Sequence, residues 1–439
     1  MNRKYTWSYL VHLSTNMWYD RPADKFETSY CRIRGLSGKL LFNENVWREW
    51  VARMLETGVN QVVIDVGDGV VFPSHPELAI EGSWSPEKML GEVRRLRKVG
   101  IEAIPKLNFS TSHDSWLKHY HRQVSTSEYY RVCEDLIGDI AEMFDKPRLM
   151  HIGYDEESPN QQYTDFAVVR QGELWWKDFH WFLKVVEKKG MRPWCWADAG
   201  VNRPEEFISR CPKSALLSNW YYWAPFDSTV KQVRLYEKLD KAGFDQVPCG
   251  SVWGVPDNFQ TMVSYCSRRF DPSHLKGFMM ANWARTLPRY RDMASRSFDA
   301  MSEAISVAEF GRNPRISPMQ MWIVKDGGID RWYRDNDRIY IAPGEMLVVD
   351  FGRLAEMKPV LELEGGEQGY ELSFFAADKT DGAKLACPSG SAPETIKARA
   401  REQRYDALAS RKMRFAALQA HGATAVVTAV EAILKVFDK

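Results

Sequence analysis

The sequence predicts a (β/α)8 TIM barrel over residues 1–312, followed by a smaller C-terminal β-sandwich domain over residues 313–439. Eight short apolar runs alternate with longer amphipathic stretches between Tyr9 and about Trp283. No GxGxxG turn accompanies them, as it would in a dinucleotide-binding open sheet. After Pro314 the segments become strand-like and are punctuated by turn residues, which predicts the second domain. A length of 439 residues also favours one large and one smaller domain.

The eight apolar runs are the predicted barrel strands. In order they read YLVHLSTN, VNQVVIDVGD, IEAIPKLNF, RLMHIGYDE, MRPWCWADA, ALLSNWY, VPCGSVWG and KGFMMANW. The stretches between them have helical periodicity and end signals. In SPEKMLGEVRRLRKVG, for example, Ser85 is placed as an N-cap, Pro86 as the first helical residue and Gly100 as the stop. Eight such strand–helix units over roughly 300 residues are typical of the barrel.

The C-terminal region reads as a series of strands. Its apolar segments are MQMWIVKDG, DRIYIAPGEMLVVDFG, GYELSFFAAD, MRFAALQAHG and ATAVVTAVEAILKVFDK. Trp322 and Trp332 are expected to be exposed aromatic side chains of this domain. The domain either binds glycan or braces the barrel, and the sequence leaves both open.

Bulk composition excludes several classes of function. A formal net charge of +1 argues against a nucleic-acid binder that works by bulk electrostatics. No apolar run approaches the roughly 20 residues that span a bilayer. The N-terminal residues as written lack the apolar core and cleavage site of a signal peptide, so the compartment stays open, as does the oligomeric state. Seven scattered Cys without a CxxC pair predict neither a zinc site nor a disulfide framework.

Polar and aromatic side chains gather at the predicted strand ends, where barrel enzymes place their catalytic groups. Strands five to eight each close on at least one Trp, in a chain that has 17 Trp. Trp rings with carboxylates and amides between them predict a carbohydrate pocket. The strand-end residues are Asn16 and Trp18; Asp65 and Asp68; Lys106, Asn108 and His113; His151, Asp155 and Glu156; Trp194, Trp196 and Asp198; Asn219, Trp220 and Tyr222; Trp253 and Asp257; Asn282, Trp283 and Arg285.

The segment RLMHIGYDEES ends a predicted strand on three consecutive carboxylates. Alternation along a strand would point His151, Gly153 and Asp155 the same way, so Gly153 is expected to leave room for a ligand beside Asp155. Glu156 would turn over the same pocket, and Glu157 is expected to face solvent. The alternative is that Asp155 or Glu156 caps the following helix.

HIGYDE resembles the His-x-Gly-Gly-Asp-Glu signature of family 20 glycoside hydrolases, the β-N-acetylhexosaminidases, with Tyr154 where the second Gly usually stands. GIEAIPKLNFSTSH, from Gly100 to His113, looks like that family's third strand, where Gly-Ile-x-x-Ile-Pro-Glu-Ile-Asp is expected. HPELAIEG resembles the stretch that leads into the preceding helix. The resemblance covers roughly residues 5–300.

The resemblance implies an exo-acting enzyme with a substrate-assisted retaining mechanism, in which the substrate's 2-acetamido oxygen attacks the anomeric carbon. By position, Glu156 would be the general acid/base and Asp155 would hold the acetamide N–H. Tyr221 or Tyr222 would bond the acetamide oxygen. The residues that would wall the pocket are Trp220, Trp253 and Trp283. Independently of the family, an adjacent Asp charge and apolar Trp walls would raise the pKa of Glu156.

The sequence departs from the family in several places. The Arg that clamps the sugar after strand one has no clear counterpart, since this segment offers Asn16 and, displaced, Arg21. The third-strand acids are replaced by Lys106 and Asn108. After strand eight Arg285 replaces a Glu. Either the two new cations bind an anionic substituent on the sugar, or they pair with carboxylates of the barrel such as Asp65, Asp68 or Asp257.

Three alternatives remain. A conventional glycosidase would pair Glu156 with a second carboxylate, namely Asp65, Asp68, Asp198 or Asp257. A decayed hydrolase barrel would bind carbohydrate without turnover. A metal-dependent hydrolase is disfavoured, because His12, His113 and His151 are not spaced as a ligand set; we expect no metal and no cofactor.

Overall fold

The computed structural model describes residues 4–22, 33–165, 168–313, 315–316, 318–333, 338–364, 370–375, 394–398, 411–421 and 423–434. Two compact units divide the chain. The first comprises Met1–Tyr221, Asp227–Ser251 and Arg269–Ser302, and the second comprises Tyr222–Phe226, Val252–Arg268 and Glu303–Lys439. The sequence-based boundary between residues 312 and 313 stays a prediction.

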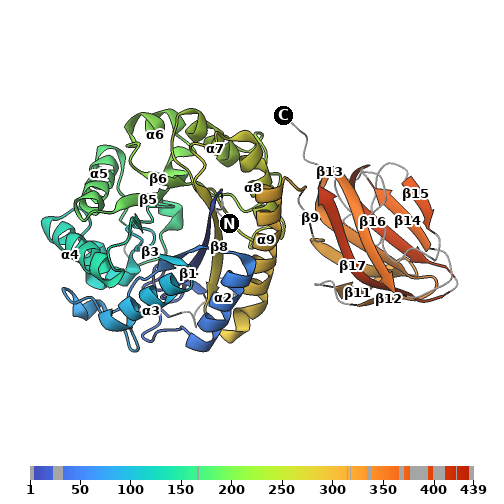
Figure 1. The fold of residues 1–439 in the computed structure, drawn as a ribbon, viewed down its shortest axis with the longest axis horizontal. Helices are drawn as coiled ribbons and strands as arrows, with labels where there is room; N and C mark the ends of the chain where they lie inside the picture. Colours follow the sequence, from blue (N-terminus) through green and yellow to red (C-terminus); the bar gives the residue numbers. More distant parts are fainter. Residues whose placement is uncertain are drawn as a thin grey trace. The chain divides into compact units, whose positions relative to one another are not determined.

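Eight parallel strands form one sheet, in the order β6-β5-β4-β3-β2-β1-β8-β7 (Figure 1). Parallel bridges from Leu217 to Gln246 and from Trp220 to Cys249 join the two ends of this order and close the barrel. The strands are β1 (Thr6–His12), β2 (Gln61–Asp65), β3 (Glu102–Lys106), β4 (Leu149–His151), β5 (Arg192–Trp196), β6 (Leu216–Ser218), β7 (Cys249–Gly250) and β8 (Gly277–Arg285).

Helices follow the strands, as the alternation of the sequence predicts. They are α2 (Glu44–Thr57), α3 (Pro86–Lys98), α4 (Ser127–Met143), α5 (Gly172–Lys188), α6 (Pro204–Arg210), α7 (Lys231–Lys241), α8 (Asn258–Arg269) and α9 (Arg291–Phe310). Short 3-10 helices are η2 (Pro76–Leu78), η3 (Ser115–Arg122), η4 (Pro159–Gln161), η5 (Asp198–Gly200) and η6 (Pro288–Tyr290). The predicted cap of α3 is confirmed, because the Ser85 side chain accepts the N–H of Lys88 at 3.2 Å. Among the helices described, none is long and apolar enough to cross a bilayer.

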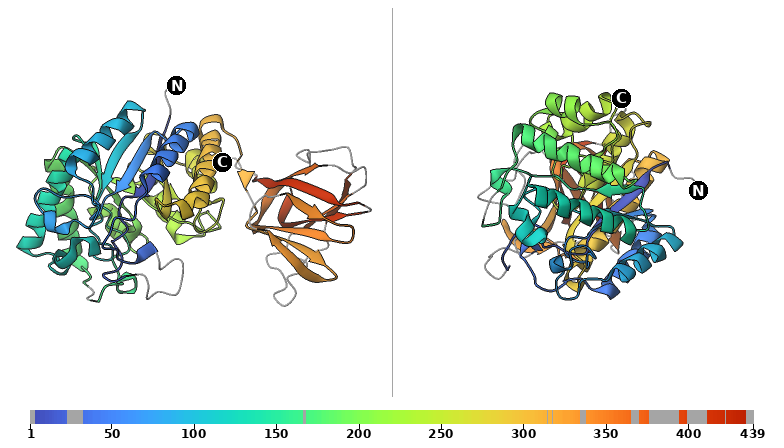
Figure 2. Two further views of the ribbon diagram at one scale, coloured as in Figure 1. Left: turned by 90° about the horizontal axis from the view of Figure 1, so that it is seen from below. Right: turned by 90° about the vertical axis from the view of Figure 1, so that its left-hand side faces the viewer.

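The elements described after α9 are all strands, drawn orange to red in Figure 2. They are β9 (Arg315–Ile316), β10 (Gln320–Lys325), β11 (Gly328–Tyr333), β12 (Ile339–Ile341), β13 (Met346–Glu364), β14 (Tyr370–Phe375), β15 (Glu394–Ala398), β16 (Arg411–Ala420) and β17 (Ala425–Leu434). They pair antiparallel in the order β11-β10-β13-β16-β14-β15, and β17 joins β13, β12 and β9.

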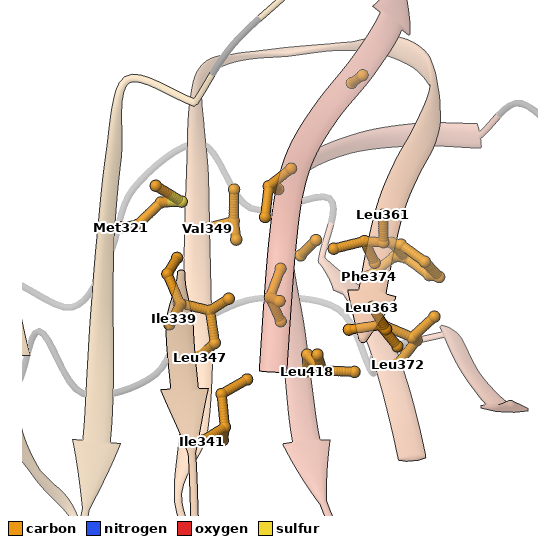
Figure 3. Packing of buried hydrophobic residues seen from close by; sticks show 14 of the residues in the cluster. Met321, Ile339, Ile341, Leu347, Val349, Leu361, Leu363, Leu372, Phe374 and Leu418 are labelled. Atoms are coloured by element: carbon orange, nitrogen blue, oxygen red, sulfur yellow. The ribbon is translucent and has the colours of Figure 1, made fainter. Parts of the chain in front are cut away.

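The long strand β13 belongs to two ladders. Its first half pairs with β10, its second half pairs with β17, and its register against β16 shifts between Asp350 and Ala355, where Gly352 takes a φ of +79°. A strand that bends at such a point can pass between the layers of a sandwich. Side chains from these strands pack into one apolar core, as Figure 3 shows for Met321, Ile339, Leu347 and Leu418 among others. The predicted fold class, a (β/α)8 barrel with a smaller all-β domain of sandwich type, is confirmed.

The prediction that Trp322 and Trp332 are both exposed was wrong for one of them. Trp322 is 1% exposed and packs with Val324, Val348 and Phe415, whereas Trp332 is 52% exposed. The two Trp residues are cross-strand partners on β10 and β11, with ring centroids 5.4 Å apart. Alternation along a strand does not reveal that the second face of this sheet is also covered.

Candidate active site

Four neighbouring barrel strands end on side chains that can carry or share a proton. In the strand register His12 lies opposite Asp65, Asp65 opposite Lys106, and Lys106 opposite His151. All four side chains are buried. The structure therefore brings together three residues that the sequence predicted, and adds His12 to them.

Lys106 forms a fully buried ion pair with Asp65. Its Nζ donates to Oδ2 of Asp65, and the Lys106 side chain has no exposed surface. His12 Nδ1 lies 3.3 Å from the same oxygen. Burial alone would raise the pKa of Asp65, but the charge of Lys106 and the hydrogen bond of His12 outweigh it and hold that pKa below its ordinary value. For Lys106, the alternative of an ion pair within the barrel is the one observed.

Arg285 is bound by neutral groups. Its Nε donates to Oγ1 of Thr15 at 2.9 Å, and one terminal nitrogen donates to the carbonyl oxygens of Ile33 (3.0 Å) and Gly35 (3.1 Å). The side chain is buried, and burial lowers the pKa of Arg285. No ion pair of Arg285 with a carboxylate is found among the described residues. A role in binding an anionic substituent stays a prediction.

The segment after β4 leaves the strand conformation at once. Gly153, Tyr154 and Glu156 take φ values of +69°, +78° and +54°. This left-handed region suits glycine, and each other residue in it costs about 1–3 kcal/mol. The ring of Tyr154 is fully buried, which offsets part of that cost. The Tyr154 ring contacts Trp175, Phe179, Phe182 and the guanidinium of Arg170.

Gly153 makes room for a protein side chain, and the expectation that it leaves space for a ligand was wrong. A Cβ at Gly153 would overlap the carboxamide of Asn108. Asn108 Oδ1 accepts the N–H groups of Ser110 and Tyr154, both at 3.1 Å, while its Nδ2 donates to Oδ1 of Asp155 at 2.8 Å. Asn108 thus holds both the strained backbone and the Asp155 carboxylate.

Gly153→Ala is expected to lower kcat by about 10²-fold, because displacement of Asn108 by an ångström moves the Asp155 carboxylate out of place. The measurement is steady-state turnover of an aryl 2-acetamido glycoside, the substrate class that the family resemblance implies. Gly91→Ala is the matched control, since a Cβ at this helical glycine meets no atom within 4 Å. Activity of Gly153→Ala within threefold of wild type would show that Asn108 does not position Asp155.

Glu157 is buried, and the expectation that it faces solvent was wrong. Its side chain is 2% exposed and forms a two-point ion pair with Arg170, with Nε–Oε1 and Nη2–Oε2 distances of 2.8 and 2.7 Å. Arg170 also lies 3.3 Å from Asp178 and donates to the carbonyl of Phe109. The left-handed residues before Glu157 break the strand-like alternation of side-chain faces. The Glu157 side chain therefore points into the protein and not to solvent.

Glu156 lies between a histidine and a second carboxylate. Its Oε2 is 3.5 Å from Nε2 of His113, whose Nδ1 is 3.7 Å from Oδ1 of Asp155. The backbone N–H of Glu156 donates to Oδ2 of Asp198 at 2.9 Å. The Glu156 side chain is 23% exposed, whereas that of Asp155 is 7% exposed. The four predicted residues Asp155, Glu156, His113 and Asp198 therefore form one cluster.

Electrostatics in this cluster favour a protonated Glu156. Burial raises the pKa of Glu156 to about 8, with help from the negative charges of Asp155 and Asp198 and against the positive charge of Arg34. Burial, followed by the charge of Asp155, raises the pKa of Asp198 to about 7. Burial lowers the pKa of His113 despite the opposing charge of Asp155. A carboxyl group with a raised pKa beside a neutral imidazole has the properties of a general acid.

The alkaline limb of the pH–rate profile should report the ionisation of Glu156. Because only its protonated form can donate, kcat should be level below pH 8 and fall about tenfold per pH unit well above it. Asp198→Asn keeps an acceptor for the Glu156 N–H but removes a charge that raises the pKa, so the limb should move to lower pH. If the alkaline limb of Asp198→Asn lies at the same pH as that of wild type, the charge of Asp198 does not raise the pKa of Glu156.

Asn16 and Asp68 bind each other and the loop after β1. Asn16 Nδ2 donates to Asp68 Oδ2 (2.9 Å) and to the carbonyl of Ser37 (2.7 Å), and its Oδ1 accepts the N–H of Ser37. Ser14 Oγ donates to the other oxygen of Asp68. Burial raises the pKa of Asp68 to about 6, against these hydrogen bonds. Their role in substrate binding stays a prediction.

Aromatic rings lie over the strand ends. Trp283 stacks on His12 with centroids 5.2 Å apart and meets Trp18 edge-on at 6.1 Å. Trp196 is 2% exposed, and its ring centroid lies 4.7 Å from that of His151. Burial lowers the pKa of His151 well below its ordinary value, so this imidazole is neutral. The predicted aromatic side chains thus contact the polar strand ends directly.

Arg34 is a site residue that sequence reasoning missed. Its guanidinium lies 5.5 Å from the ring centroid of Trp18 and 4.9 Å from that of Tyr163. Its charge lowers the pKa of both Glu156 and His113. Arg21, which the sequence offered as a displaced counterpart of the sugar-clamping Arg, pairs with Asp165. Nothing in the local sequence RIRG distinguishes Arg34, whose contact with the ring of Tyr163 comes from a segment far along the chain.

The remaining predicted residues follow β6 and β7. The Trp220 side chain donates a hydrogen bond to Asp198, and burial raises the pKa of Tyr221. Both belong to the first compact unit. Tyr222 and Trp253 belong to the second, with ring centroids 6.4 Å apart, as does Asp257. Their roles at the site stay predictions.

Among the described residues, one group of side chains has donor atoms close enough to hold a metal ion. Ligand atoms of His113, Asp155 and Glu156 lie within 4.8 Å of one another. The raised pKa of Glu156 disfavours the ionised form that a metal needs. That the protein uses no metal stays a prediction.

No protein-family model and no curated protein matches the sequence, but solved structures do. An N-acetyl-β-hexosaminidase of Streptomyces plicatus is 13% identical with a TM-score of 0.46, over 67% of this chain and 62% of that one. A mutant of the S. plicatus enzyme with bound product gives 12% and 0.49, over 69% and 63%. A GH20 exo-β-N-acetylglucosaminidase of Vibrio harveyi gives 14% and 0.46, over 69% and 54%.

The chain therefore spans less than two thirds of the length of these neighbours. The Vibrio neighbour is a family 20 enzyme, which is the family that the HIGYDE segment resembles. All three TM-scores lie below 0.5, and the likeness says nothing of the function of this chain.

Proposed function

We propose that the protein is a retaining glycoside hydrolase that acts on 2-acetamido sugars. One observation carries the proposal: two consecutive carboxylates have opposite environments. Asp155 accepts a hydrogen bond from Asn108, while burial and like charges raise the pKa of Glu156 to about 8. A carboxyl group with a raised pKa suits the general acid, and the hydrogen-bonded Asp155 suits a positioning role.

In the proposed reaction Glu156 donates its proton to the glycosidic oxygen as the bond to the anomeric carbon breaks. The substrate's acetamide oxygen attacks that carbon and forms a cyclic oxazolinium intermediate. Asp155 accepts the acetamide N–H and stabilises the positive charge that develops there. In the second step Glu156, now a carboxylate, takes a proton from the water that opens the ring, which restores the acid. Tyr221 would bond the acetamide oxygen, and Trp220 and Trp283 would wall the sugar.

The partners of the nearby carboxylates support a substrate nucleophile over a protein one. Asp65 is engaged by Lys106 and His12, and Asp68 accepts hydrogen bonds from Ser14 and Asn16. Asp198 accepts the Glu156 N–H, and a pKa of about 7 keeps it partly protonated. Each of these acids is thus less suited to attack carbon than an ionised, free carboxylate.

The test is turnover of aryl β-glycosides with and without the 2-acetamido group. N-acetylglucosaminide and N-acetylgalactosaminide should be cleaved with retention of configuration at the anomeric carbon, as read by NMR of the first product. Glucoside, galactoside and glucuronide should not be cleaved. Sulfated acetamido sugars in the same panel report on Arg285. Cleavage of sugars that lack the acetamide would refute the mechanism and leave a two-carboxylate glycosidase.

A further inference from the structure

Arg285, the last residue of β8, holds the backbone on both sides of Arg34. One terminal nitrogen of Arg285 donates to the carbonyl oxygens of Ile33 at 3.0 Å and Gly35 at 3.1 Å. Its Nε donates to Oγ1 of Thr15, in the segment that follows β1, at 2.9 Å. All of these residues belong to the first compact unit. Arg285 therefore ties the backbone around Arg34 to the carboxyl ends of β8 and β1.

The hydrogen bonds of Arg285 need the shape of a guanidinium. The side chain is buried, its hydrogen bonds go to neutral oxygen atoms, and burial lowers the pKa of Arg285. A cation buried among neutral groups costs free energy, so its charge alone gives no reason for its presence. A guanidinium has five N–H donors in a rigid plane and can bind oxygen atoms of two chain segments at once. A lysine ammonium is a single point at the end of a flexible stem and cannot reproduce that arrangement.

The side chain of Arg34 contacts the rings beside the candidate acid. Its guanidinium lies 5.5 Å from the ring centroid of Trp18 and 4.9 Å from that of Tyr163. The Trp18 ring meets His113 edge-on, with centroids 5.9 Å apart, and His113 Nε2 lies 3.5 Å from Oε2 of Glu156. A continuous series of contacts thus leads from Arg34 to Glu156.

The charge of Arg34 also acts on this site directly. The pKa of Glu156 is raised by burial and by the charges of Asp155 and Asp198, and the positive charge of Arg34 opposes them. The same charge lowers the pKa of His113. The strength of such an effect depends on the distance between the charges, so it requires a fixed position of the guanidinium.

We propose that Arg285 is a positioning residue of the active site, which fixes the backbone around Arg34 and so holds the Arg34 guanidinium against Trp18 and near Glu156. The inference rests on the proposed function, in which Glu156 is the general acid. It adds a residue that acts on this acid through Arg34.

The experiment separates the position of Arg34 from the charge of Arg285. Arg285→Lys keeps the positive charge but loses the planar donors, while Asn16 still binds Ser37 and keeps the segment attached. It is compared with wild type, with Arg34→Met and with the double variant. Arg289→Lys is the matched control, because Arg289 is exposed four residues further along the chain. Thermal unfolding confirms that each protein is folded.

The pKa of Glu156 is read by ¹³C NMR of protein labelled at the glutamate side-chain carboxyl carbon. The signal of Glu156 is the one that is absent from Glu156→Gln. This titration needs no turnover. The alkaline limb of kcat on an aryl 2-acetamido glycoside is recorded for the same proteins as a second measurement.

Arg34→Met should raise the pKa of Glu156 by about half a pH unit, the order expected of one elementary charge across a partly solvated site. Arg285→Lys should raise it in the same direction, although no charge is lost. The double variant should match Arg34→Met alone, because Arg285 acts only through Arg34. Arg289→Lys should match wild type, and the alkaline limb should move with the pKa.

Three results would overturn the positioning role. The pKa of Glu156 could stay unchanged in Arg34→Met, or it could change in Arg34→Met but not in Arg285→Lys. The shifts of the two single variants could also add up in the double variant, which would show that the two arginines act independently. Absence of aryl glycoside turnover in wild type would instead refute the proposed function, and the NMR titration would still decide whether Arg285 positions Arg34.

Discussion

Glu156→Gln is expected to lower kcat on an aryl 2-acetamido glycoside by about 10²–10⁴-fold, the range that general acid–base catalysis contributes. Glutamine keeps the size of the side chain and the contact with His113 but cannot donate a proton at neutral pH. Because Glu156 would also act as the base for the incoming water in the proposed second step, both steps should slow. The reduction should be largest for poor leaving groups, which need protonation most.

Glu187→Gln provides the matched control, since Glu187 is exposed on α5. A Glu156→Gln variant with activity close to that of wild type would remove Glu156 from the mechanism. Calorimetric titration with N-acetylglucosamine tests the remaining alternative, a barrel that binds carbohydrate without turnover. If neither protein turns over any glycoside and both bind the sugar equally well, the barrel is a binding protein.

Lys106→Met is expected to lower the free energy of unfolding by about 3–5 kcal/mol, the range for a buried ion pair that loses one partner. The variant leaves the Asp65 carboxylate buried next to a neutral side chain. In the wild type the pKa of Asp65 is held below its ordinary value, so the pair stabilises the fold above that ordinary value and the stabilisation is lost as the pH falls toward the lowered pKa. Urea unfolding at neutral pH measures the difference.

Two further variants sharpen this test. Lys98→Met removes an exposed lysine on α3 and should change stability by less than about 0.5 kcal/mol. Lys106→Met combined with Asp65→Leu removes both charges and should recover most of the loss, since a hydrophobic replacement of a buried pair is often neutral. A double variant as unstable as Lys106→Met alone would show that volume, and not charge, decides the stability at this position.

Much of the fold follows from local pattern. The eight apolar runs became the eight strands of the barrel, and the residues at their ends cluster because the carboxyl ends of parallel strands share one edge. The place of Asp155 and Glu156 directly after the fourth strand also follows from the sequence pattern, whereas their catalytic roles stay predictions. Ser85 was identified as a cap from its hydroxyl and the proline that follows. These predictions needed only the spacing of apolar residues and the fact that parallel strands place their carboxyl ends at one edge.

The remaining features depend on contacts between distant segments. Glu157 faces inward because the alternation of faces ends at β4, and because Arg170 meets it from 13 residues away. Gly153 is required by Asn108, which follows another strand, β3. Arg34 contacts the ring of Tyr163, which lies in a segment far along the chain. Sequence patterns describe one helix or strand at a time and contain no information on contacts between distant segments.

The left-handed backbone of Gly153, Tyr154 and Glu156 has a consequence for ligands. An unfolded chain rarely visits these backbone angles, so the conformational entropy of this segment is lost when the protein folds. A ligand that arrives beside Glu156 meets an acid whose backbone is already ordered and does not have to freeze it. Association there should then follow a single kinetic phase, with no slow rearrangement after the first encounter.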